Sequence, residues 1–170
     1  MQNGFCHPNG RFGKLGLSVA NHLDIVSAIN KLSTASHATK MQKLKGFVRG
    51  TWDADVLDDL APDTSKGDNM INKTRNSAFL STGLKELLFS RGINQLLCTS
   101  VGSNVCVEST VRDGVSHDFY CKTLSDATAT LTMEDYNACM KNLVWFSGVT
   151  TVEEVLRALK KRQNKASEQD

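Results

Sequence analysis

The sequence predicts an α/β fold built around a parallel sheet. From residue 69 onward, short apolar runs alternate with segments of helical period, which is the pattern of successive βα units. The 170 residues are enough to bury one hydrophobic core, and the sequence has no internal repeat. We therefore expect a single domain over residues 1–160, followed by a flexible tail over residues 161–170.

The first unit of this pattern consists of a strand, a helix and a second strand. Residues 69–73 form a brief strand candidate, and residues 82–92 have helical period up to Gly92, a residue that suits the position after a helix end. Residues 94–101 centre on the apolar run LLC, so we expect a buried strand there. The apolar positions of the helix are Leu84, Leu87 and Leu88.

The second unit begins with a turn-prone run of small residues. A helix is predicted over residues 104–113, with Ser103 or Asn104 as its N-cap and Gly114 as its terminator. Residues 119–125 then form the next strand.

Two further helices are predicted in the C-terminal part. Residues 132–146 and 151–161 each begin with a threonine that is followed three residues later by an acid, which is the spacing of a capping box. These threonines are Thr132 and Thr151. The second helix also has one apolar face, which consists of Val152, Val155, Leu156 and Leu159.

The N-terminal part departs from this pattern. Residues 17–32 have the period of an amphipathic helix, and a doubly wound fold requires a strand on either side of such a helix. Only MQNGF and a glycine-rich loop precede it, and residues 33–46 contain no run of three apolar residues. We therefore expect the first and second strands of the sheet to be missing, which makes residues 1–46 a remnant of the N-terminal part.

Composition argues against several classes of partner. The net charge is +2, and the basic run at residues 160–165 has no aromatic residues beside it, so we expect a solvated chain end and no nucleic-acid partner. The sequence has neither an apolar stretch long enough to cross a membrane nor the apolar segment of a signal peptide. No G-x-G-x-x-G turn follows a first strand, which argues against a Rossmann-type nucleotide binder.

Cysteine and histidine usage bears on redox compartment and metals. The five cysteines include no CxxC pair, and the four histidines show no HxH or HxxxH spacing. This pattern favours neither a zinc site nor a disulfide framework. We therefore expect a cytoplasmic protein that needs no metal and no cofactor.

Four segments of the chain resemble those of one known family. They contain the motifs K-T-R-x-S-A-F, S-N-x-C-V-x-S-T-x-R-D and a following D-A, in that order. This combination is similar to that of the isochorismatase-like cysteine hydrolases, and it most resembles the branch of ureidoacrylate and biuret amidohydrolases. The run MQNGF also resembles the family's first motif, D-x-Q-x-x-F, without its leading acid. The four segments are residues 50–62, 72–93, 96–114 and 124–130.

The resemblance implies a three-layer α/β/α sandwich on a parallel sheet and a catalytic set of Asp, Lys and Cys. The lysine corresponds to Lys73 and the cysteine to Cys106. The acid belongs at the end of the first strand, one or two residues before Gln2, so we expect this chain to lack it. Because the cysteine is present, the resemblance favours acyl chemistry on a C–N bond of a small amide or ureido substrate.

Cys106 occupies a position that favours a reactive thiol. Near the start of a helix, unpaired backbone N–H groups and the helix dipole stabilise a thiolate. The amides of Gly102 and Cys106 are candidates for an oxyanion hole, and the resemblance implies a cis peptide between Val101 and Gly102. The Lys73 ammonium would stabilise both the thiolate and the oxyanion. The alternatives are a buried structural cysteine and a surface lysine at a strand end.

Four other residues are candidate substrate contacts: Arg75, Trp52, Gln2 and Asn104. Arg75 suits a substrate carboxylate or carbonyl and Trp52 a substrate wall, whereas a surface arginine and a packed loop are the alternatives. Asp126 follows the strand at 119–125, where it caps or braces a loop more readily than it replaces the missing acid.

Two hypotheses of function follow. In the first, the chain is an isochorismatase-like cysteine hydrolase, shortened at its N-terminus and impaired because its acid is absent. The intact motifs around Lys73 and Cys106 favour this hypothesis. In the second, the chain is a catalytically inactive pseudoenzyme that acts through binding or through assembly of an oligomer. In either case we expect a homo-oligomer if the chain folds.

Overall fold

The computed structural model describes residues 9, 14, 32–34 and 47–167. Two elements of the sequence analysis, residue Gln2 and the helix predicted up to residue 31, lie outside these ranges. The expected absence of a first strand likewise concerns a part of the chain that is not described. The account of the fold is therefore built on the segment from residue 47 onward, together with one short strand that precedes it.

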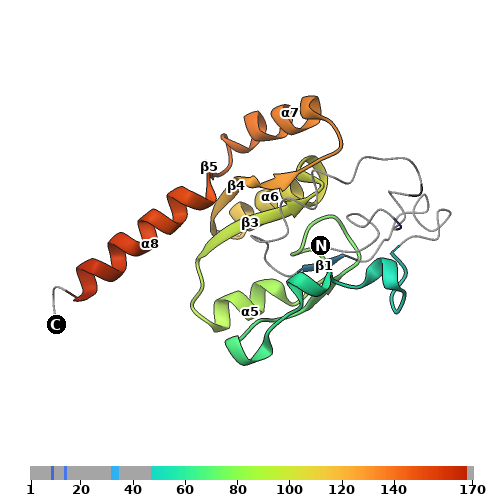
Figure 1. Ribbon diagram of the computed structural model, residues 1–170, viewed down its shortest axis with the longest axis horizontal. Coiled ribbons are helices and arrows are strands. Elements are labelled where there is room, and N and C mark those ends of the chain that lie inside the picture. Colours follow the sequence, from blue (N-terminus) through green and yellow to red (C-terminus); the bar gives the residue numbers. More distant parts are fainter. Residues whose placement is uncertain (1–8, 10–13, 15–31, 35–46, 168–170) are drawn as a thin grey trace.

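The larger sheet has three parallel strands in the order β3-β4-β5. They are β3 (Gln95–Val101), β4 (Tyr120–Ala129) and β5 (Gly148–Thr150). Helix α6 (Glu108–Ser116) connects the first pair of strands, and α7 (Met133–Leu143) connects the second. Figure 1 shows these helices beside the sheet. The predicted α/β fold with a parallel sheet is thus confirmed, and each connection is a βα unit.

A second sheet pairs β1 (Leu32–Thr34) with β2 (Ile71–Lys73), also in parallel, with Thr34 opposite Lys73. The expectation that no strand follows residues 17–32 was therefore wrong. Leu32 itself lies in this strand and not in a helix. A strand can be as short as three residues. Backbone hydrogen bonds hold such a strand, and they require no run of apolar side chains that would reveal the strand in the sequence.

The helix and strand that follow β2 agree with their predictions in position. Helix α5 spans Leu84–Ser90, and Gly92 follows with φ +64°, the left-handed conformation expected of a glycine after a helix end. Strand β3 was predicted to be buried, yet Gln95 is exposed and Leu97 is 38% exposed. The strand lies at an edge of its three-stranded sheet, which explains this partial exposure.

The start and end of the next helix differ from the prediction. A π-helical turn, η5 (Ser103–Val107), precedes α6, and Gly102 is the residue before that turn, with φ +77°. Neither Ser103 nor Asn104 acts as an N-cap, because Ser103 lies inside the π-helical turn and the side chain of Asn104 instead accepts a hydrogen bond of 2.7 Å from Thr130 Oγ1.

Gly114 does not end α6 but lies within it, because the helix continues to Ser116. The residue is buried, and a Cβ atom there would come within 2.7 Å of Cys121 Sγ and 3.3 Å of Phe79 Cε2. Glycine is therefore required at this position for close packing of the helix on β4, and not as a helix terminator.

Two hydrophobic clusters lie on opposite faces of β4. Cys121 belongs to one cluster and Leu124 to the other, and residues an odd number apart in a strand point to opposite faces. In the first cluster, the Phe119 ring stacks on those of Phe79 and Phe89, with centroid distances of 5.5 and 5.0 Å. The buried members of the second cluster are Leu60, Val101, Leu124, Ala127 and Ala129.

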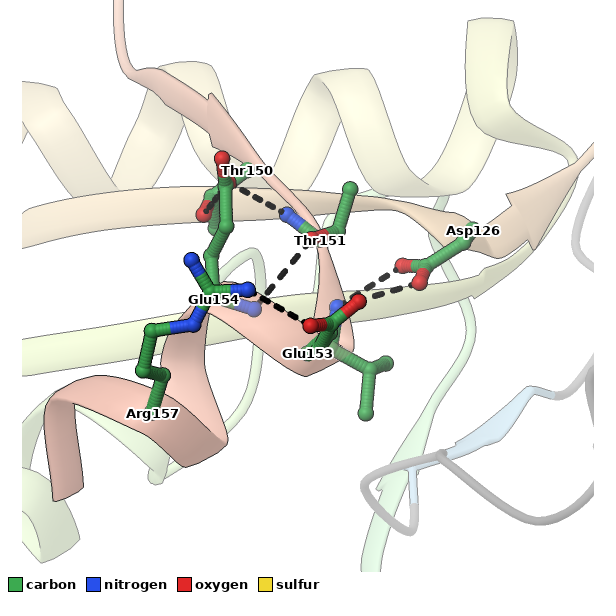
Figure 2. Close-up of polar contacts among 7 residues, drawn as sticks. Asp126, Thr150, Thr151, Glu153, Glu154 and Arg157 are labelled. Carbon is green, nitrogen blue, oxygen red and sulfur yellow. Dashed lines mark hydrogen bonds and ion pairs between the residues drawn. The ribbon is translucent and has the colours of Figure 1, made fainter. Parts of the chain in front are cut away.

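Both threonines cap their helices, but only the second forms a complete capping box. Thr132 Oγ1 accepts from Asp135 N at 3.1 Å at the start of α7, and the Asp135 carboxylate accepts from the Thr132 hydroxyl at 2.7 Å and not from its backbone N–H. At the start of α8 (Val152–Ser167), Thr151 N donates to Glu154 Oε2 at 3.1 Å and Glu154 N donates to Thr151 Oγ1 at 3.3 Å, as Figure 2 shows.

Asp126 lies inside β4 and not beyond it, because the strand continues to Ala129. Its carboxylate oxygens accept hydrogen bonds from the backbone N–H of Val152 at 3.0 and 3.1 Å (Figure 2). A carboxylate at this position satisfies an unpaired N–H of the first turn of α8 and complements the helix dipole. The expectation that Asp126 would cap or brace a neighbouring element is consistent with this contact.

Helix α8 extends away from the rest of the molecule in Figure 1. Val152 and Val155 pack against the cluster around Leu124, whereas Leu156 and Leu159 are 52% and 48% exposed. Only the first turn of the predicted apolar face is therefore buried. The helix runs to Ser167, so residues 161–167 are helical, and the flexible tail over residues 161–170 stays a prediction.

Replacing Gly114 by alanine is expected to lower the free energy of unfolding by about 1–3 kcal/mol, because the added methyl group overpacks the contact with Cys121 and Phe79. In an open helix the same change would stabilise by about 1 kcal/mol. Urea unfolding measures the difference. Gly83→Ala is the matched control, since a Cβ there meets nothing within 4 Å. A Gly114→Ala protein as stable as Gly83→Ala would contradict the prediction.

Replacing Asp126 by alanine is expected to lower the free energy of unfolding by about 1 kcal/mol, because the Val152 N–H loses its acceptor at the start of α8. Hydrogen exchange at the first amides of α8 should accelerate in the same variant. Asp55→Ala, which removes an exposed carboxylate from a loop, serves as the control. Unchanged exchange at Val152 would argue against the capping contact.

Candidate active site

Cys106 lies in the π-helical turn between β3 and α6 and is partly exposed. Its carbonyl oxygen accepts a hydrogen bond of 2.7 Å from Thr110 Oγ1, and the same hydroxyl accepts one of 3.0 Å from the backbone N–H of Ala78. Thr110 therefore connects the turn that carries the thiol to the segment that follows β2. This segment also contains the end of the K-T-R-x-S-A-F motif.

Lys73 ends β2 and is only 3% exposed. Its Nζ donates to the carbonyl oxygens of Arg75 at 2.9 Å and Asn76 at 2.8 Å. Burial lowers the pKa of Lys73, and the charge of the Cys106 thiolate together with a hydrogen bond to its sulfur partly offsets that change. The two residues that the resemblance paired are thus brought together, and Lys73 is not the surface lysine of the alternative interpretation.

The other described thiols are less suited to be nucleophiles. A hydrogen bond that the Cys98 thiol donates to Cys121, together with burial, raises the pKa of Cys98 well above its usual range, and the same bond lowers the pKa of Cys121. Burial raises the pKa of Cys139 to about 12. Cys121 itself is only 5% exposed. A thiol that is buried or held protonated reacts poorly, so Cys106 is the best placed of these four.

The two amides predicted to form an oxyanion hole are both engaged within the protein. The Gly102 N–H donates to the carbonyl of Ala129 at 3.0 Å, and the Cys106 N–H donates to the carbonyl of Gly102 at 2.9 Å. The described residues contain no cis peptide, so the one expected between Val101 and Gly102 is absent. In this conformation the predicted oxyanion hole is therefore not preformed, because the trans backbone continues the β3–β4 pairing through Gly102.

The strand that leads into this turn is irregular. The β3–β4 register shifts between Cys98 and Ser100, and Ser100 has φ +143°. A positive φ is uncommon for a residue other than glycine, and such strain is found most often at functional sites. The irregularity lies directly before the turn that presents Cys106.

A cavity of about 590 Å³ adjoins Cys106 and Lys73, which both line it. Its walls come from β2, from α5, from the start of α6 and from every residue between Gln95 and Ser100 of β3. A volume of this size is typical of sites for small organic molecules. The apolar side chains of the wall are Ile71, Phe79, Leu84, Leu87, Leu88, Ile93, Leu96, Leu97 and Val107.

The predicted substrate contacts are placed away from this cavity. Arg75 is exposed, and its guanidinium donates only weakly, at 3.4 Å, to the carbonyl of Thr74. Trp52 is 47% exposed, and Asn104 is exposed and bound to Thr130. None of the three is among the described residues that line the cavity. Gln2 lies outside the part of the chain that the structure describes.

Two features of the site were not predicted from the sequence. Thr110 is part of the S-T-x-R-D run, but nothing in the run indicates that its hydroxyl bridges Cys106 and Ala78. The leucines of α5 were recognised as the apolar positions of a helix, but not as part of the wall of a cavity. In both cases the sequence identifies the residue, but it does not show what that residue contacts in the folded chain.

Among the described residues, neither a carboxylate that acts on Lys73 nor a metal-ligating cluster is found at the site. No carboxylate is among the groups that shift the pKa of Lys73. The described residues contain no group of three or more His, Cys, Asp or Glu side chains arranged to hold a metal ion. Nor does any helix among them have the length and apolar character that crossing a membrane requires.

Comparison with known proteins places this site in a family. Residues 1–154 match the family model described as the isochorismatase domain. The ureidoacrylate amidohydrolase RutB of Caulobacter vibrioides is 41% identical over 99 residues, an alignment that covers 58% of this chain and 43% of that protein. The alignment therefore spans less than half of the length of this relative.

Solved structures show the same fold. An isochorismatase-like hydrolase from Alkaliphilus metalliredigens superposes with a TM-score of 0.67 and 32% identity, over 75% of this chain and 67% of that one. A cysteine hydrolase from Pseudomonas syringae pv. phaseolicola superposes with a TM-score of 0.79 and 24% identity, over 95% of this chain and 89% of that one. Together with the family match over residues 1–154, these likenesses show that the chain belongs to the isochorismatase domain family.

Proposed function

We propose that the chain cleaves the C–N bond of a small amide or ureido compound through an acyl-enzyme on Cys106. One observation carries this proposal: the buried Lys73 and the Cys106 thiol line the same cavity of ligand size, and Cys106 opposes the lowering of the pKa of Lys73 by burial. The names of the similar proteins, a ureidoacrylate amidohydrolase and a cysteine hydrolase, support the same class of reaction.

In the proposed reaction, the Cys106 sulfur attacks the carbonyl carbon and the C–N bond breaks, so that the proton of the thiol ends on the leaving amine and an S-acyl cysteine remains. Two carbonyl groups hold the Lys73 ammonium, which leaves its remaining donor for the sulfur. Its positive charge stabilises the thiolate and the developing oxyanion. Water then cleaves the thioester and releases the carboxylic acid.

The second half of this reaction should be the slower one. Deacylation needs a base that activates water, and no carboxylate contributes to the electrostatics of Lys73 in the described part of the chain. The oxyanion amides are also engaged, with Gly102 bound to Ala129. We therefore propose that acylation outpaces deacylation and that the acyl-enzyme accumulates.

The alternative is a pseudoenzyme that binds a small amide or a partner without turning it over. The engaged amides of Gly102 and Cys106 favour it, because they would have to be released before they could stabilise an oxyanion. We further propose that the protein acts in the cytoplasm as a homo-oligomer, without a cofactor. Analytical ultracentrifugation at several protein concentrations tests the oligomer, and a sedimentation coefficient of a monomer throughout would contradict it.

Replacing Cys106 by serine is expected to abolish the burst of p-nitrophenolate from p-nitrophenyl acetate, because the serine hydroxyl is not ionised by a nearby ammonium at neutral pH. The acetyl adduct should disappear from the intact mass of the protein. Cys98→Ser is the matched control, because Cys98 lines the same cavity but has a raised pKa. A burst that is equal in the two variants would exclude Cys106 as the nucleophile.

Steady-state ammonia release from small ureido compounds and carboxamides separates the two functions. The hydrolase requires release that depends on Cys106, even where it is slow. The pseudoenzyme requires binding of these compounds, measured by calorimetry, with no release above that of Cys106→Ser.

Replacing Lys73 by methionine is expected to slow alkylation of Cys106 by iodoacetamide at pH 7 about tenfold, because the thiolate loses the nearby positive charge. Peptide mapping measures the rate at each cysteine. Lys73→Arg keeps the charge and should retain part of the rate, while Lys66→Met, which removes an exposed ammonium that does not line the cavity, should not change it. The prediction fails if Lys73→Met and Lys66→Met react at the same rate.

A further inference from the structure

The hydroxyl of Thr110 makes two hydrogen bonds that serve different elements. Thr110 lies in α6, where a threonine commonly donates to the carbonyl four residues before it, and it donates in this way to Cys106 at 2.7 Å. The same oxygen accepts from the backbone N–H of Ala78 at 3.0 Å, which lies 32 residues away in the sequence. Because a hydroxyl has one proton to donate and lone pairs to accept with, both contacts form at once.

The segment that contains Ala78 also holds the Lys73 ammonium. Lys73 Nζ donates to the carbonyl oxygens of Arg75 at 2.9 Å and Asn76 at 2.8 Å. Ala78 follows two residues later and is completely buried. The hydroxyl of Thr110 therefore connects the backbone that holds the cation to the backbone that carries the thiol. A shift of either backbone changes the distance between the ammonium and the sulfur.

Apolar packing also holds this segment against α6. Phe79, the residue after Ala78, belongs to the same buried cluster as Val107 and Val111. Apolar contacts have no preferred direction, whereas a hydrogen bond constrains both a distance and an angle. The attraction between an ammonium and a thiolate depends on their separation. Packing therefore keeps the two segments together, and the hydroxyl bridge fixes how they are aligned.

Lys73, Cys106 and Thr110 line the same cavity. Burial lowers the pKa of Lys73 and Cys106 opposes this change, so the cation and the thiol influence each other in this arrangement. We propose that Thr110 is a positioning residue, whose hydroxyl holds the Cys106 thiol at the distance from Lys73 at which the ammonium activates it. The inference rests on the proposed function, because it concerns the same nucleophile. No bond to Thr110 forms or breaks in the reaction.

The first test is alkylation of Cys106 by iodoacetamide at pH 7, measured by peptide mapping. Thr110→Val removes the hydroxyl at nearly constant volume and should slow alkylation about fivefold, because the thiolate is held less well beside the cation. Thr110→Ser keeps the hydroxyl and should restore most of the rate. Thr123→Val makes the same change at a fully buried hydroxyl that has no hydrogen-bond partner among the described residues, and it should have no effect. Equal rates for Thr110→Val and Thr123→Val would overturn the proposal.

The sign of the effect separates positioning from a loss of stability. A destabilised protein opens more often, and opening accelerates alkylation of every thiol. The buried Cys139 reports such opening in the same peptide map. Val111→Ala loosens the packing of α6 but keeps the hydroxyl bridge, so it should accelerate Cys139 without slowing Cys106. If Val111→Ala slows Cys106 as much as Thr110→Val does, the bridge has no specific role and the proposal fails.

A double-mutant cycle tests whether Thr110 acts through the cation. In a Lys73→Met background, Thr110→Val should change the alkylation rate of Cys106 less than twofold, because the hydroxyl then has no ammonium against which to position the thiol. A further fivefold slowing in this background would mean that Thr110 acts on Cys106 independently of Lys73, which would overturn the proposal.

The burst of p-nitrophenolate from p-nitrophenyl acetate separates this inference from the proposed function. If the burst depends on Cys106 but Thr110→Val alkylates like the unmodified protein, the positioning role fails and the proposed function stands. If alkylation responds to Thr110→Val and Thr110→Ser as expected but neither a burst nor ammonia release depends on Cys106, the proposed function fails and the positioning of the thiol holds.

Discussion

The interaction between Lys73 and Cys106 is the constraint on which the site depends. A buried ammonium is unfavourable unless its donors are satisfied, and here two backbone carbonyls accept from Nζ, while Cys106 opposes the effect of burial on the pKa of Lys73. Because burial lowers the pKa of Lys73 below its ordinary value of 10.5, the unfolded chain binds this proton more tightly than the folded one. The contribution of Lys73 to stability is therefore least favourable below the folded pKa and improves as the pH rises towards the unfolded value. Burial of the protonated Lys73 therefore opposes folding, and its interaction with Cys106 offsets part of this effect.

The backbone around the thiol explains how the pair is held and also what the site lacks. Thr110 links the carbonyl of Cys106 to Ala78, so the π-helical turn and the segment after β2 form one hydrogen-bonded unit. The same backbone uses the Gly102 N–H to continue the β3–β4 pairing at Ala129. An oxyanion would have to compete with that hydrogen bond, whereas the thiolate does not. The described structure therefore places a positive charge near the nucleophile, but it does not offer free backbone amides to the tetrahedral intermediate.

Local features were predictable from the sequence, whereas features that depend on a distant partner were not. The capping contacts at Thr132 and Thr151 involve neighbouring residues only, and both were located from their spacing. Gly114 was predicted to end the helix. The residue is instead required because a Cβ atom there would come too close to the sulfur of Cys121 on an adjacent strand, a contact that the sequence does not reveal. The N-cap role of Asn104 failed for the same kind of reason, since Thr130 binds its side chain. The positions of Lys73 and Cys106 were available through motif resemblance, but their mutual contact joins two separate sheets and appears only in the folded chain.

The leucines of α5 show what helical periodicity can and cannot predict about function. Spacing of three and four residues indicates which side of a helix avoids water, but a packed core and an apolar binding cavity require the same residues. What separates them is whether neighbouring elements fill the space that the helix faces. Along α5 they do so only in part, because Leu84 and Leu88 pack against the cluster around Phe79 while they also line the cavity. Whether α5 faces a packed core or a cavity is therefore a property of tertiary structure to which no single motif corresponds.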